Sequence, residues 1–327
     1  MNYRTLGNTG IDVSEVSFGT WAIGGSWGQT NDQEALNGLA RAMDAGVNFF
    51  DTADVYGLGH AEELLAKATK GKDNIYIATK FCRKGDETHA NTYKEDAVRN
   101  FVEDSLRKLD RECIDLYQIH CPPLHILKDG NIFSVLEKLK QEGKIRGYGV
   151  SVETIEEGHE ALRYEGISAL QVIFNIFRQL PLETLFPQAH KQGVGILARV
   201  PLASGLLTGK FSTDSTFAEN DHRQFNKNGE RFSVGETFAG LTLQTGVQLA
   251  DQLKWIAEGR GSMTQAALRW ILDHEEVTCA IPGFKRPEQV EDTLKAIDVP
   301  SYSEKELQDL AEFYKQHVHH HIRGAYA

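Results

Sequence analysis

Short apolar runs that favour β-structure alternate with helical patterns along most of the chain. Residues 47–50, 75–80 and 114–120 are rich in valine, isoleucine, phenylalanine and tyrosine, and they are separated by polar or glycine-containing segments, which is typical of buried strands. After the second run, apolar residues such as Val98 and Val102 recur at helical spacing and indicate an amphipathic helix. Strands that alternate with helices in this way predict an α/β protein built on a parallel sheet.

Five further runs complete the predicted set of strands, at residues 16–20, 144–151, 169–175, 194–200 and 277–281. The alternation alone fits either a closed barrel or an open, doubly wound sheet. The first strand, however, is not followed by the Gly-x-Gly-x-x-Gly fingerprint that marks an open dinucleotide-binding sheet. This absence counts against the dinucleotide-binding open sheet.

Three segments lie outside the alternation. Residues 3–14 contain two short β-favouring runs around a turn of glycine and asparagine, which predicts a β-hairpin. Residues 203–240 form an insertion of mixed charge without a sustained period, and a loop of this length in a compact domain is usually functional. Two helical patterns, at 287–296 and 304–316, close the chain. We expect residues 1–327 to form a single domain, a barrel of about 250 residues with insertions.

Composition narrows the class of protein. The chain has 41% apolar and 25% charged residues, as soluble globular enzymes do, and its net charge of −11 disfavours a nucleic-acid partner. No stretch of about 18 apolar residues predicts a membrane span. The cysteines are scattered without Cys-x-x-Cys spacing, so we expect neither a disulfide framework nor a zinc site, and a reducing cytoplasm. They are Cys82, Cys113, Cys121 and Cys279.

Four ionisable side chains stand at or just after the ends of three consecutive predicted strands. Asp51 ends the first strand and Tyr56 follows five positions later, Lys80 ends the second, and His120 ends the third. Taken singly, each has an ordinary structural explanation, such as a helix cap, a packed aromatic or a solvated lysine. Together they predict a reactive site, because the carboxyl ends of parallel strands meet at one face of the sheet.

With these four residues in this order, the sequence resembles the aldo-keto reductase superfamily, whose catalytic tetrad is Asp, Tyr, Lys and His. The likeness extends from Leu6-Gly7 to about Asp292 and is closest to the bacterial and potassium-channel-β-like branch. It implies a (β/α)8 TIM barrel whose bottom is closed by the N-terminal hairpin, with a long loop after strand seven and extra C-terminal helices.

The resemblance also implies the chemistry, an NADP(H)-dependent reduction of aldehydes, ketones or sugars to alcohols by hydride transfer, or the reverse. Tyr56 would donate the proton, and a phenol with a pKa of about 10 needs help to do so at neutral pH. Lys80 would favour the phenolate, Asp51 would pair with Lys80, and His120 would orient the carbonyl.

A cofactor site follows from the same resemblance. Ser151 and Gln171 match the ligands of the nicotinamide carboxamide, residues 201–210 match a segment that wraps the pyrophosphate, and Lys285 with Arg286 would hold an adenosine 2′-phosphate. NADP(H) is therefore expected, with NAD(H) as the alternative. The expected contacts are Thr20, Trp21, Ser151, Gln171, Arg199, Pro201, Leu202, Gly205, Lys210, Arg223, Gly283, Lys285, Arg286, Gln289 and Asp292, with Trp21 and Trp27 in the substrate pocket.

Two positions depart from the pattern of many relatives. Arg199 stands where an aromatic residue stacks on the nicotinamide, and we hypothesise that its charge weakens binding of the oxidised cofactor relative to the reduced one. Thr293 stands where an asparagine contacts adenine. The second departure leaves the choice between NADP(H) and NAD(H) open.

Two other classes of function compete with a reductase. A non-catalytic sensor or regulatory subunit that binds a nicotinamide nucleotide would keep the fold but not the turnover. A metal- or phosphate-dependent isomerase or lyase would need paired acidic ligands or a dedicated phosphate loop, and neither is evident. Clustered histidines at 317–321 suit a polar C-terminal segment, and we assign no metal there. The sequence leaves open which small carbonyl compound or sugar is the substrate. It also leaves open whether the protein is a monomer or a homo-oligomer.

Overall fold

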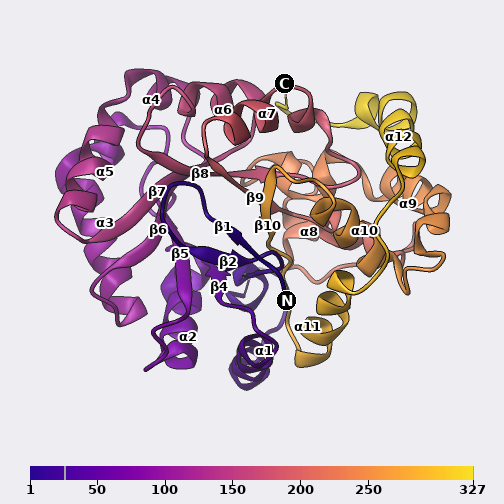
Figure 1. Cartoon of the computed structure of the whole chain (residues 1–327), viewed down its shortest axis with the longest axis horizontal. Coiled ribbons are helices and arrows are strands. Elements are labelled where there is room, and N and C mark those ends of the chain that lie inside the picture. Colours follow the sequence, from indigo (N-terminus) through magenta and orange to yellow (C-terminus); the bar gives the residue numbers. More distant parts are fainter. Residues whose placement is uncertain (26, 327) are drawn as a thin grey trace.

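The protein, described here from a computed structural model that covers residues 1–25 and 27–326, is built around a sheet of eight parallel strands (Figure 1). Each strand pairs with the next along the chain, so neighbours in sequence are neighbours in the sheet. The strands are β3 (Phe18–Gly19), β4 (Phe49–Asp51), β5 (Tyr76–Phe81), β6 (Ile114–His120), β7 (Ile145–Val152), β8 (Ile167–Ile173), β9 (Gly195–Arg199) and β10 (Val277–Ala280).

Backbone contacts between the first and last of these strands close the sheet. The amide of Ser17 donates to the carbonyl of Ala280 at 2.9 Å, and the amide of Gly19 donates to the carbonyl of Pro282 at 3.0 Å. A parallel bridge between Val16 and Ala280 lies beside them. The fold is therefore the expected (β/α)8 TIM barrel, and the open doubly wound sheet is excluded.

Helices surround the barrel and connect its strands (Figure 1). Local sequence signals fix several of their ends. At the start of α6, for example, the Thr154 hydroxyl accepts from the amide of Glu157 while the Glu157 carboxylate accepts from the amide of Thr154. The helices are α1 (Asp32–Asp44), α2 (His60–Thr69), α3 (Glu95–Leu109), α4 (Leu124–Asp129), α5 (Asn131–Gln141), α6 (Ile155–Ala161), α7 (Leu185–Lys191), α8 (His222–Phe225), α9 (Leu243–Gln252), α10 (Met263–Leu272), α11 (Pro287–Leu294) and α12 (Glu304–Phe313).

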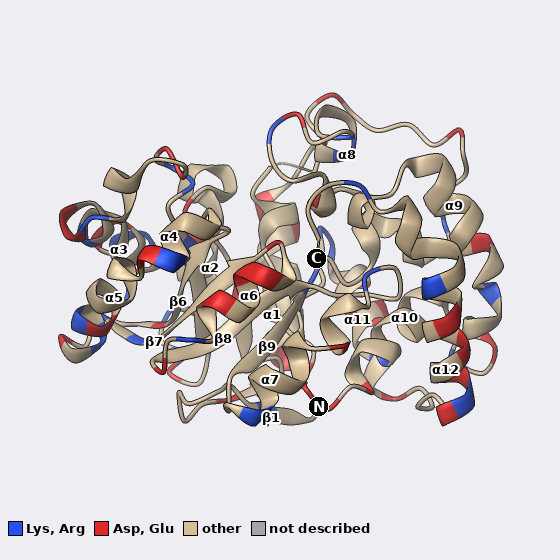
Figure 2. Cartoon of the chain, turned by 90° about the horizontal axis from the view of Figure 1, so that it is seen from above, with Lys and Arg blue, Asp and Glu red and all other residues tan. Residues whose placement is uncertain are grey.

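Charged residues are carried mainly by the outer helices and the loops. Figure 2 shows acidic and basic residues mixed along α12 and on α4. Among the described residues, no helix combines the length and the apolar character needed to cross a membrane.

The N-terminal hairpin seals one end of the barrel. Strands β1 (Tyr3–Thr5) and β2 (Asp12–Ser14) pair antiparallel, and their turn needs Gly7, whose φ is +52° and whose added Cβ would lie 1.9 Å from the carbonyl oxygen of Ser168. Apolar hairpin residues pack with a ring of inward-facing strand residues. The resulting layer is Leu6, Ile11 and Val13 from the hairpin with Phe49, Ala78, Leu116, Ala169, Leu197 and Cys279 from the barrel.

A polar layer lies directly above this apolar one. Side chains on a strand alternate between its two faces, so a residue two positions further along points into the barrel as well. The polar layer is thereby fixed by the register of the apolar layer. Its members are Asp51 after Phe49, Lys80 after Ala78, Gln118 after Leu116, Gln171 after Ala169 and Arg199 after Leu197.

The long loop after β9 is more structured than its lack of sequence period predicts. It contains α8 and the short 3₁₀ helices Ala203–Thr208, Val234–Glu236 and Phe238–Gly240. The C-terminal segment holds it in place, because the Arg323 guanidinium donates to the carbonyls of Gly240 and Lys227, both at 2.9 Å. These hydrogen bonds therefore hold the loop in place over the barrel.

Candidate active site

The four residues singled out from the sequence come together at the carboxyl end of the barrel. Lys80, which is fully buried, donates from Nζ to Asp51 Oδ1 at 2.6 Å and to the carbonyl of Thr52 at 2.8 Å. Its third contact is the Tyr56 hydroxyl at 3.4 Å. The Tyr56 and His120 rings meet edge to face with centroids 6.0 Å apart. The ammonium therefore links the carboxylate to the phenol.

Two amides hold the other oxygen of the carboxylate. Asp51 Oδ2 accepts from Gln171 Nε2 at 2.7 Å and from Gln118 Nε2 at 3.2 Å. Gln171, expected as a carboxamide ligand, lines the cavity and also orients Asp51. Gln118 was not singled out from the sequence, although it lies two residues before His120 and so shares its face of β6.

Burial dominates the proton affinities of the two groups that face a substrate. It raises the pKa of Tyr56, and the opposing effect of Lys80 is too small to reverse this. Burial also holds the pKa of His120 well below its usual value, and the nearby cations Arg83, Lys80 and Arg199 add to the effect. At neutral pH the phenol therefore keeps its proton and the imidazole is uncharged.

The sequence-based expectation was that the Lys80 ammonium favours the phenolate form of Tyr56. The ammonium does act in that direction, but the loss of hydration of the phenolate outweighs it. Burial also lowers the pKa of Lys80, yet the Asp51 carboxylate and Tyr56 offset this and leave it above its ordinary value. Lys80 therefore stays charged and is available to stabilise a phenolate that forms during a reaction.

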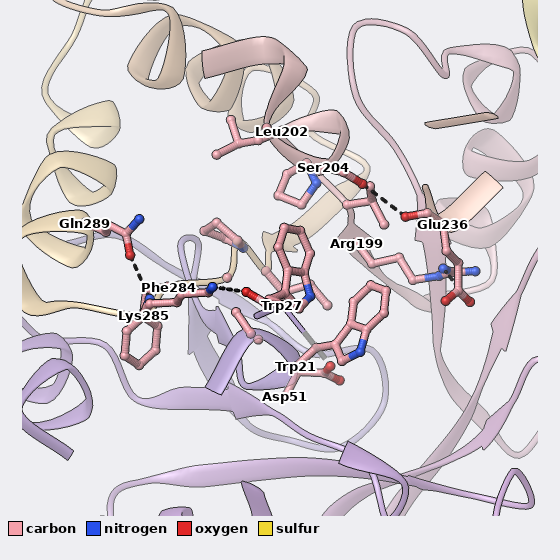
Figure 3. Close-up of a pocket in the computed structure, with 18 of the residues that line it drawn as sticks. Trp21, Trp27, Asp51, Arg199, Leu202, Ser204, Glu236, Phe284, Lys285 and Gln289 are labelled. Atoms are coloured by element: carbon pink, nitrogen blue, oxygen red, sulfur yellow. Dashed lines mark hydrogen bonds and ion pairs between the residues drawn. The ribbon is translucent and has the colours of Figure 1, made fainter. Parts of the chain in front are cut away.

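A cavity of ≈ 420 Å³ opens above the tetrad. Figure 3 shows Trp21, Trp27 and Asp51 in the middle of the view, with Arg199 and Glu236 to the right and Lys285 and Gln289 to the left. Most of the expected site residues line it: Trp21, Trp27, Asp51, Tyr56, His120, Gln171, Arg199, Pro201, Leu202, Gly205, Lys210, Arg223, Gly283, Lys285, Arg286 and Gln289.

Four of the expected residues are not among those that line this cavity. Lys80 lies beneath it in the polar layer. Thr20 donates from its hydroxyl to the carbonyl of Asp51 at 3.2 Å, and Ser151 receives a weak contact from Cys121 Sγ at 3.5 Å. Asp292 accepts from Gln265 Nε2 at 2.7 Å. Each of the last three is engaged with its own protein neighbours in this structure.

The part of the cavity that is lined by Lys285 and Arg286 is basic and lies at the N-terminus of α11. The amides of Lys285 and Arg286 donate to Gln289 Oε1 at 2.7 and 3.2 Å, which orders the start of α11. The Lys285 ammonium bonds the carbonyl of Trp27 across the cavity. Arg223 lies 4.9 Å from the Trp27 ring and pairs with Asp221 at 2.6 Å. Positive charge and helix N–H groups together suit an anionic ligand.

Comparison with known proteins decides the family. The model of the aldo/keto reductase family matches residues 15–315. The chain belongs to the aldo/keto reductase family. It is 33% identical to aldo-keto reductase YhdN of Bacillus subtilis (strain 168) over 300 residues, which cover 89% of this chain and 87% of that protein.

This aldo/keto reductase is also similar to two proteins whose names describe different functions. It is 29% identical to a probable voltage-gated potassium channel subunit beta of Arabidopsis thaliana, with 91% of this chain and 92% of that one covered. Its structure is similar to that of a glycerol dehydrogenase from Gluconobacter oxydans, with a TM-score of 0.77, 32% identity and coverage of 97% and 96%. The resemblance stated from the sequence is thus confirmed, and this aldo/keto reductase is an oxidoreductase that acts on carbonyl groups.

Sequence reasoning missed several residues of this aldo/keto reductase at or next to the cavity, among them His222 and Glu236. His222, from α8, packs its ring 4.6 Å from Trp21 and 4.3 Å from Trp27, the two tryptophans that line the cavity. Glu236, from the long loop, is buried and lies 3.3 Å from Arg199 Nη1 and 3.1 Å from Arg83 Nη2. Both come from the segment without a sequence period, where only the length of the loop pointed to a role.

Proposed function

We propose that this aldo/keto reductase reduces a small aldehyde, ketone or sugar carbonyl with NADP(H), and that Tyr56 donates the proton. The observation that carries the proposal is the placement of a protonated phenol, bound at 3.4 Å to a buried ammonium, at the wall of a cavity with a basic far end. A carbonyl placed against Tyr56 and His120 would also be within reach of a cofactor in that cavity.

The residues present fit a nicotinamide nucleotide. A cavity of ≈ 420 Å³ is within the range of small-molecule sites. At one edge Gly205 has φ +103°, and a Cβ there would lie 2.8 Å from the Phe211 ring, so both the backbone conformation and the packing against Phe211 favour glycine. Lys210, Lys285 and Arg286 supply positive charge for phosphate groups.

When bound, the nicotinamide supplies the hydride, and the protein handles the proton and the charge. As negative charge develops on the carbonyl oxygen, Tyr56 transfers its hydroxyl proton to it. The phenolate left behind is stabilised by the Lys80 ammonium, which Asp51 holds in place. Neutral His120 keeps one ring N–H to donate to the same oxygen and so orients the carbonyl.

The central test is NADPH consumption with a panel of aromatic aldehydes, short aldehydes and aldoses, for wild type and Tyr56→Phe. We expect turnover by wild type and a loss of about 10²–10⁴-fold in kcat for the variant, the usual contribution of a general acid. NADPH affinity, followed by fluorescence, should stay nearly unchanged. Retention of most turnover in Tyr56→Phe would contradict the assigned role of this residue.

The same assay decides the second candidate function. The likeness to a probable potassium channel subunit supports a nucleotide-binding sensor or regulatory subunit as the alternative. Tight NADPH binding by wild type, without turnover of any carbonyl in the panel, would favour that alternative over the reductase.

The preference for NADP(H) over NAD(H) rests on Lys285 and Arg286, the basic pair at the start of α11. Loss of one charge–phosphate contact costs roughly 1.5–3 kcal/mol, which is about a tenfold or greater change in affinity. We therefore expect Arg286→Ala to raise the Kd for NADPH at least tenfold and to leave the Kd for NADH nearly unchanged. Equal effects on the two nucleotides would contradict recognition of a 2′-phosphate.

Cytoplasmic localisation stays a prediction from the sequence, and the oligomeric state stays open.

A further inference from the structure

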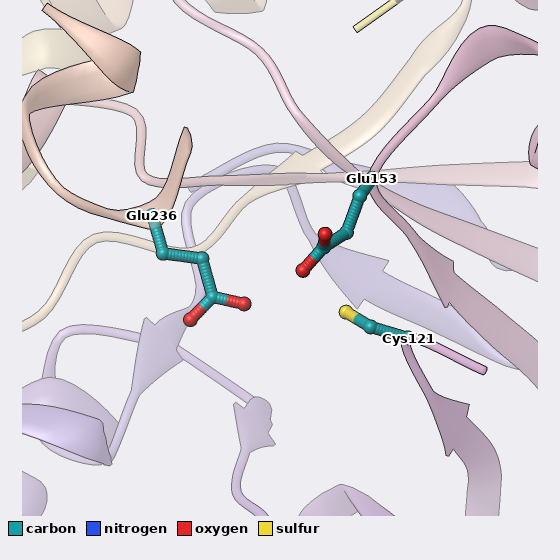
Figure 4. Close-up of side chains that lie close together, drawn as sticks. All are labelled: Cys121, Glu153 and Glu236. Atoms are coloured by element: carbon teal, nitrogen blue, oxygen red, sulfur yellow. The ribbon is translucent and has the colours of Figure 1, made fainter. Parts of the chain in front are cut away.

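Five polar side chains from separate segments form a cluster, of which Arg199 and Glu236 line the cavity beside the tetrad. Arg83 follows β5, Cys121 follows β6, Glu153 follows β7, Arg199 ends β9 and Glu236 belongs to the long loop after β9. Figure 4 shows Cys121, Glu153 and Glu236 pointing toward one another from these separate segments. No sequence motif links them, so only the fold brings them together.

Ion pairs connect the cluster into one network. The Arg83 Nη2 atom lies 3.1 Å from Glu236 Oε1 and 3.3 Å from Glu153 Oε1. The Arg199 Nη1 atom lies 3.3 Å from the same oxygen of Glu236, and its Nη2 donates to the carbonyl of Val152 at 3.1 Å. Glu236 therefore bridges both guanidinium groups.

A metal site is the first alternative for this cluster, because ligand atoms of Cys121, Glu153 and Glu236 all lie within 4.8 Å of one another. Both carboxylates, however, are already paired with arginines, and a cation would have to compete with two fixed positive charges. Burial raises the pKa of the Cys121 thiol to about 11, so the thiol stays protonated and is a poor ligand. The cluster is a neutral network of two arginines and two glutamates rather than a cation site.

The cavity side of the network faces the reacting groups. A hydride can reach a carbonyl carbon only if the nicotinamide ring lies beside the carbonyl that Tyr56 and His120 contact, and Arg199 and Glu236 line the same cavity. The ring is neutral when reduced and carries a positive charge when oxidised. Charges fixed in this wall therefore act on the two forms of the cofactor differently.

We propose that Glu236 is the counter-ion of Arg199 and, by neutralising it, sets the relative affinity of the protein for oxidised and reduced cofactor. With Glu236 in place, the cationic ring faces a balanced pair. Without its charge, the ring would face an uncompensated guanidinium in a site that excludes much of the water, where like charges repel more strongly than in solution. This inference rests on the proposed function and revises the sequence-based hypothesis, in which Arg199 acted alone.

The test is the ratio of the Kd for NADP⁺ to the Kd for NADPH, measured by isothermal titration at constant ionic strength. We expect Glu236→Gln, which keeps the shape and removes the charge, to raise this ratio about tenfold, equivalent to roughly 1.4 kcal/mol. Arg199→Gln should lower the ratio below that of wild type. The double variant Arg199→Gln/Glu236→Gln should return to within about threefold of wild type, because the two charges then vanish together.

Glu306→Gln is the matched control, since Glu306 also pairs with an arginine, Arg260 at 2.9 Å, but does not line the cavity. Its ratio should equal that of wild type. An unchanged ratio in Glu236→Gln overturns the proposal, and if that variant does not fold, a ratio in Arg199→Gln at or above that of wild type does so. Absence of binding of either nucleotide to wild type would instead contradict the proposed function itself.

Discussion

Two buried aspartates three residues apart, Asp51 and Asp54, differ in the hydrogen-bond donors that surround them. Both are almost wholly inaccessible to solvent, at 2% and 1% exposure. Asp51 points into the barrel and accepts from three side chains, Lys80, Gln118 and Gln171. Asp54 lies just past the end of β4, and neither of its carboxyl oxygens has a partner among the described side chains. Burial therefore raises the pKa of Asp54 to about 7.

The surroundings of Asp54 reinforce the contrast. Glu62 on α2 is fully buried, accepts from Thr79 at 2.7 Å, and adds negative charge that also raises the pKa of Asp54, while Lys84 opposes the shift. Burial raises the pKa of Glu62 as well. Inside the barrel, then, both oxygens of the Asp51 carboxylate are matched by hydrogen-bond donors. At Asp54, where such donors are lacking, burial instead raises the pKa of the carboxyl.

The largest expected effect comes from removing the cation from the matched site. Lys80→Met would leave the Asp51 carboxylate buried with amide donors only, and breaking a buried pair in this way costs about 3–5 kcal/mol. Urea unfolding at neutral pH should show a loss of that size. The double variant Asp51→Leu/Lys80→Met should recover part of it, since no charge is then left unpaired. A loss below about 1 kcal/mol for the single variant would show that the pair is not a stability determinant.

The second effect concerns the unmatched site and depends on pH. In the folded state Asp54 holds its proton up to about pH 7, whereas its ordinary pKa is 3.8, so the folded state binds the proton more tightly. The contribution of Asp54 protonation to the free energy of unfolding is therefore present in full below about pH 4. It falls as the pH rises to about 7 and is then lost. Asp54→Asn cannot lose a proton, so it should escape this fall.

At about pH 8, Asp54→Asn should be more stable than wild type by roughly 4 kcal/mol, the linkage effect of this pKa shift, because the asparagine amide and the protonated carboxyl are buried alike. At about pH 4 the two proteins should differ little. Thermal unfolding across this range, with Asp44→Asn on the exposed side of α1 as the control, measures the difference. A constant difference at all pH values would contradict the titration of Asp54.

The smallest effect tests how far the matched site depends on each donor. Gln118→Leu removes one hydrogen bond to Asp51 and leaves those from Lys80 and Gln171, so we expect a loss of about 1.5 kcal/mol, the lower range for a bond to a charged group. The pH dependence assigned to Asp54 should be the same as in wild type. A loss as large as that of Lys80→Met would mean that the amides, not the ammonium, hold the carboxylate.

The sequence predicted the elements that local patterns determine. Each strand has its own apolar run, and Asp51, Lys80 and His120 stand at strand ends that a barrel must bring to one face, so both the fold and the tetrad were accessible from spacing and resemblance. Glu236 was not accessible, because its partners Arg83 and Arg199 are distant in sequence and its loop has no period. The direction in which Lys80 acts on Tyr56 was predicted correctly, but the larger opposing effect of burial was not, since burial depends on the whole surrounding structure.

The hairpin at the base of the barrel has a consequence for synthesis of the chain. Its apolar residues pack against Cys279, and the Arg4 guanidinium donates to the carbonyls of Leu272 and Val277. The hairpin thus meets these last partners only after the chain between them has been made, which at about 5–20 residues per second takes on the order of tens of seconds. Until then the segment that seals the barrel has an exposed apolar side. Closure of the barrel, which needs β10, is therefore a late step in the folding of this chain.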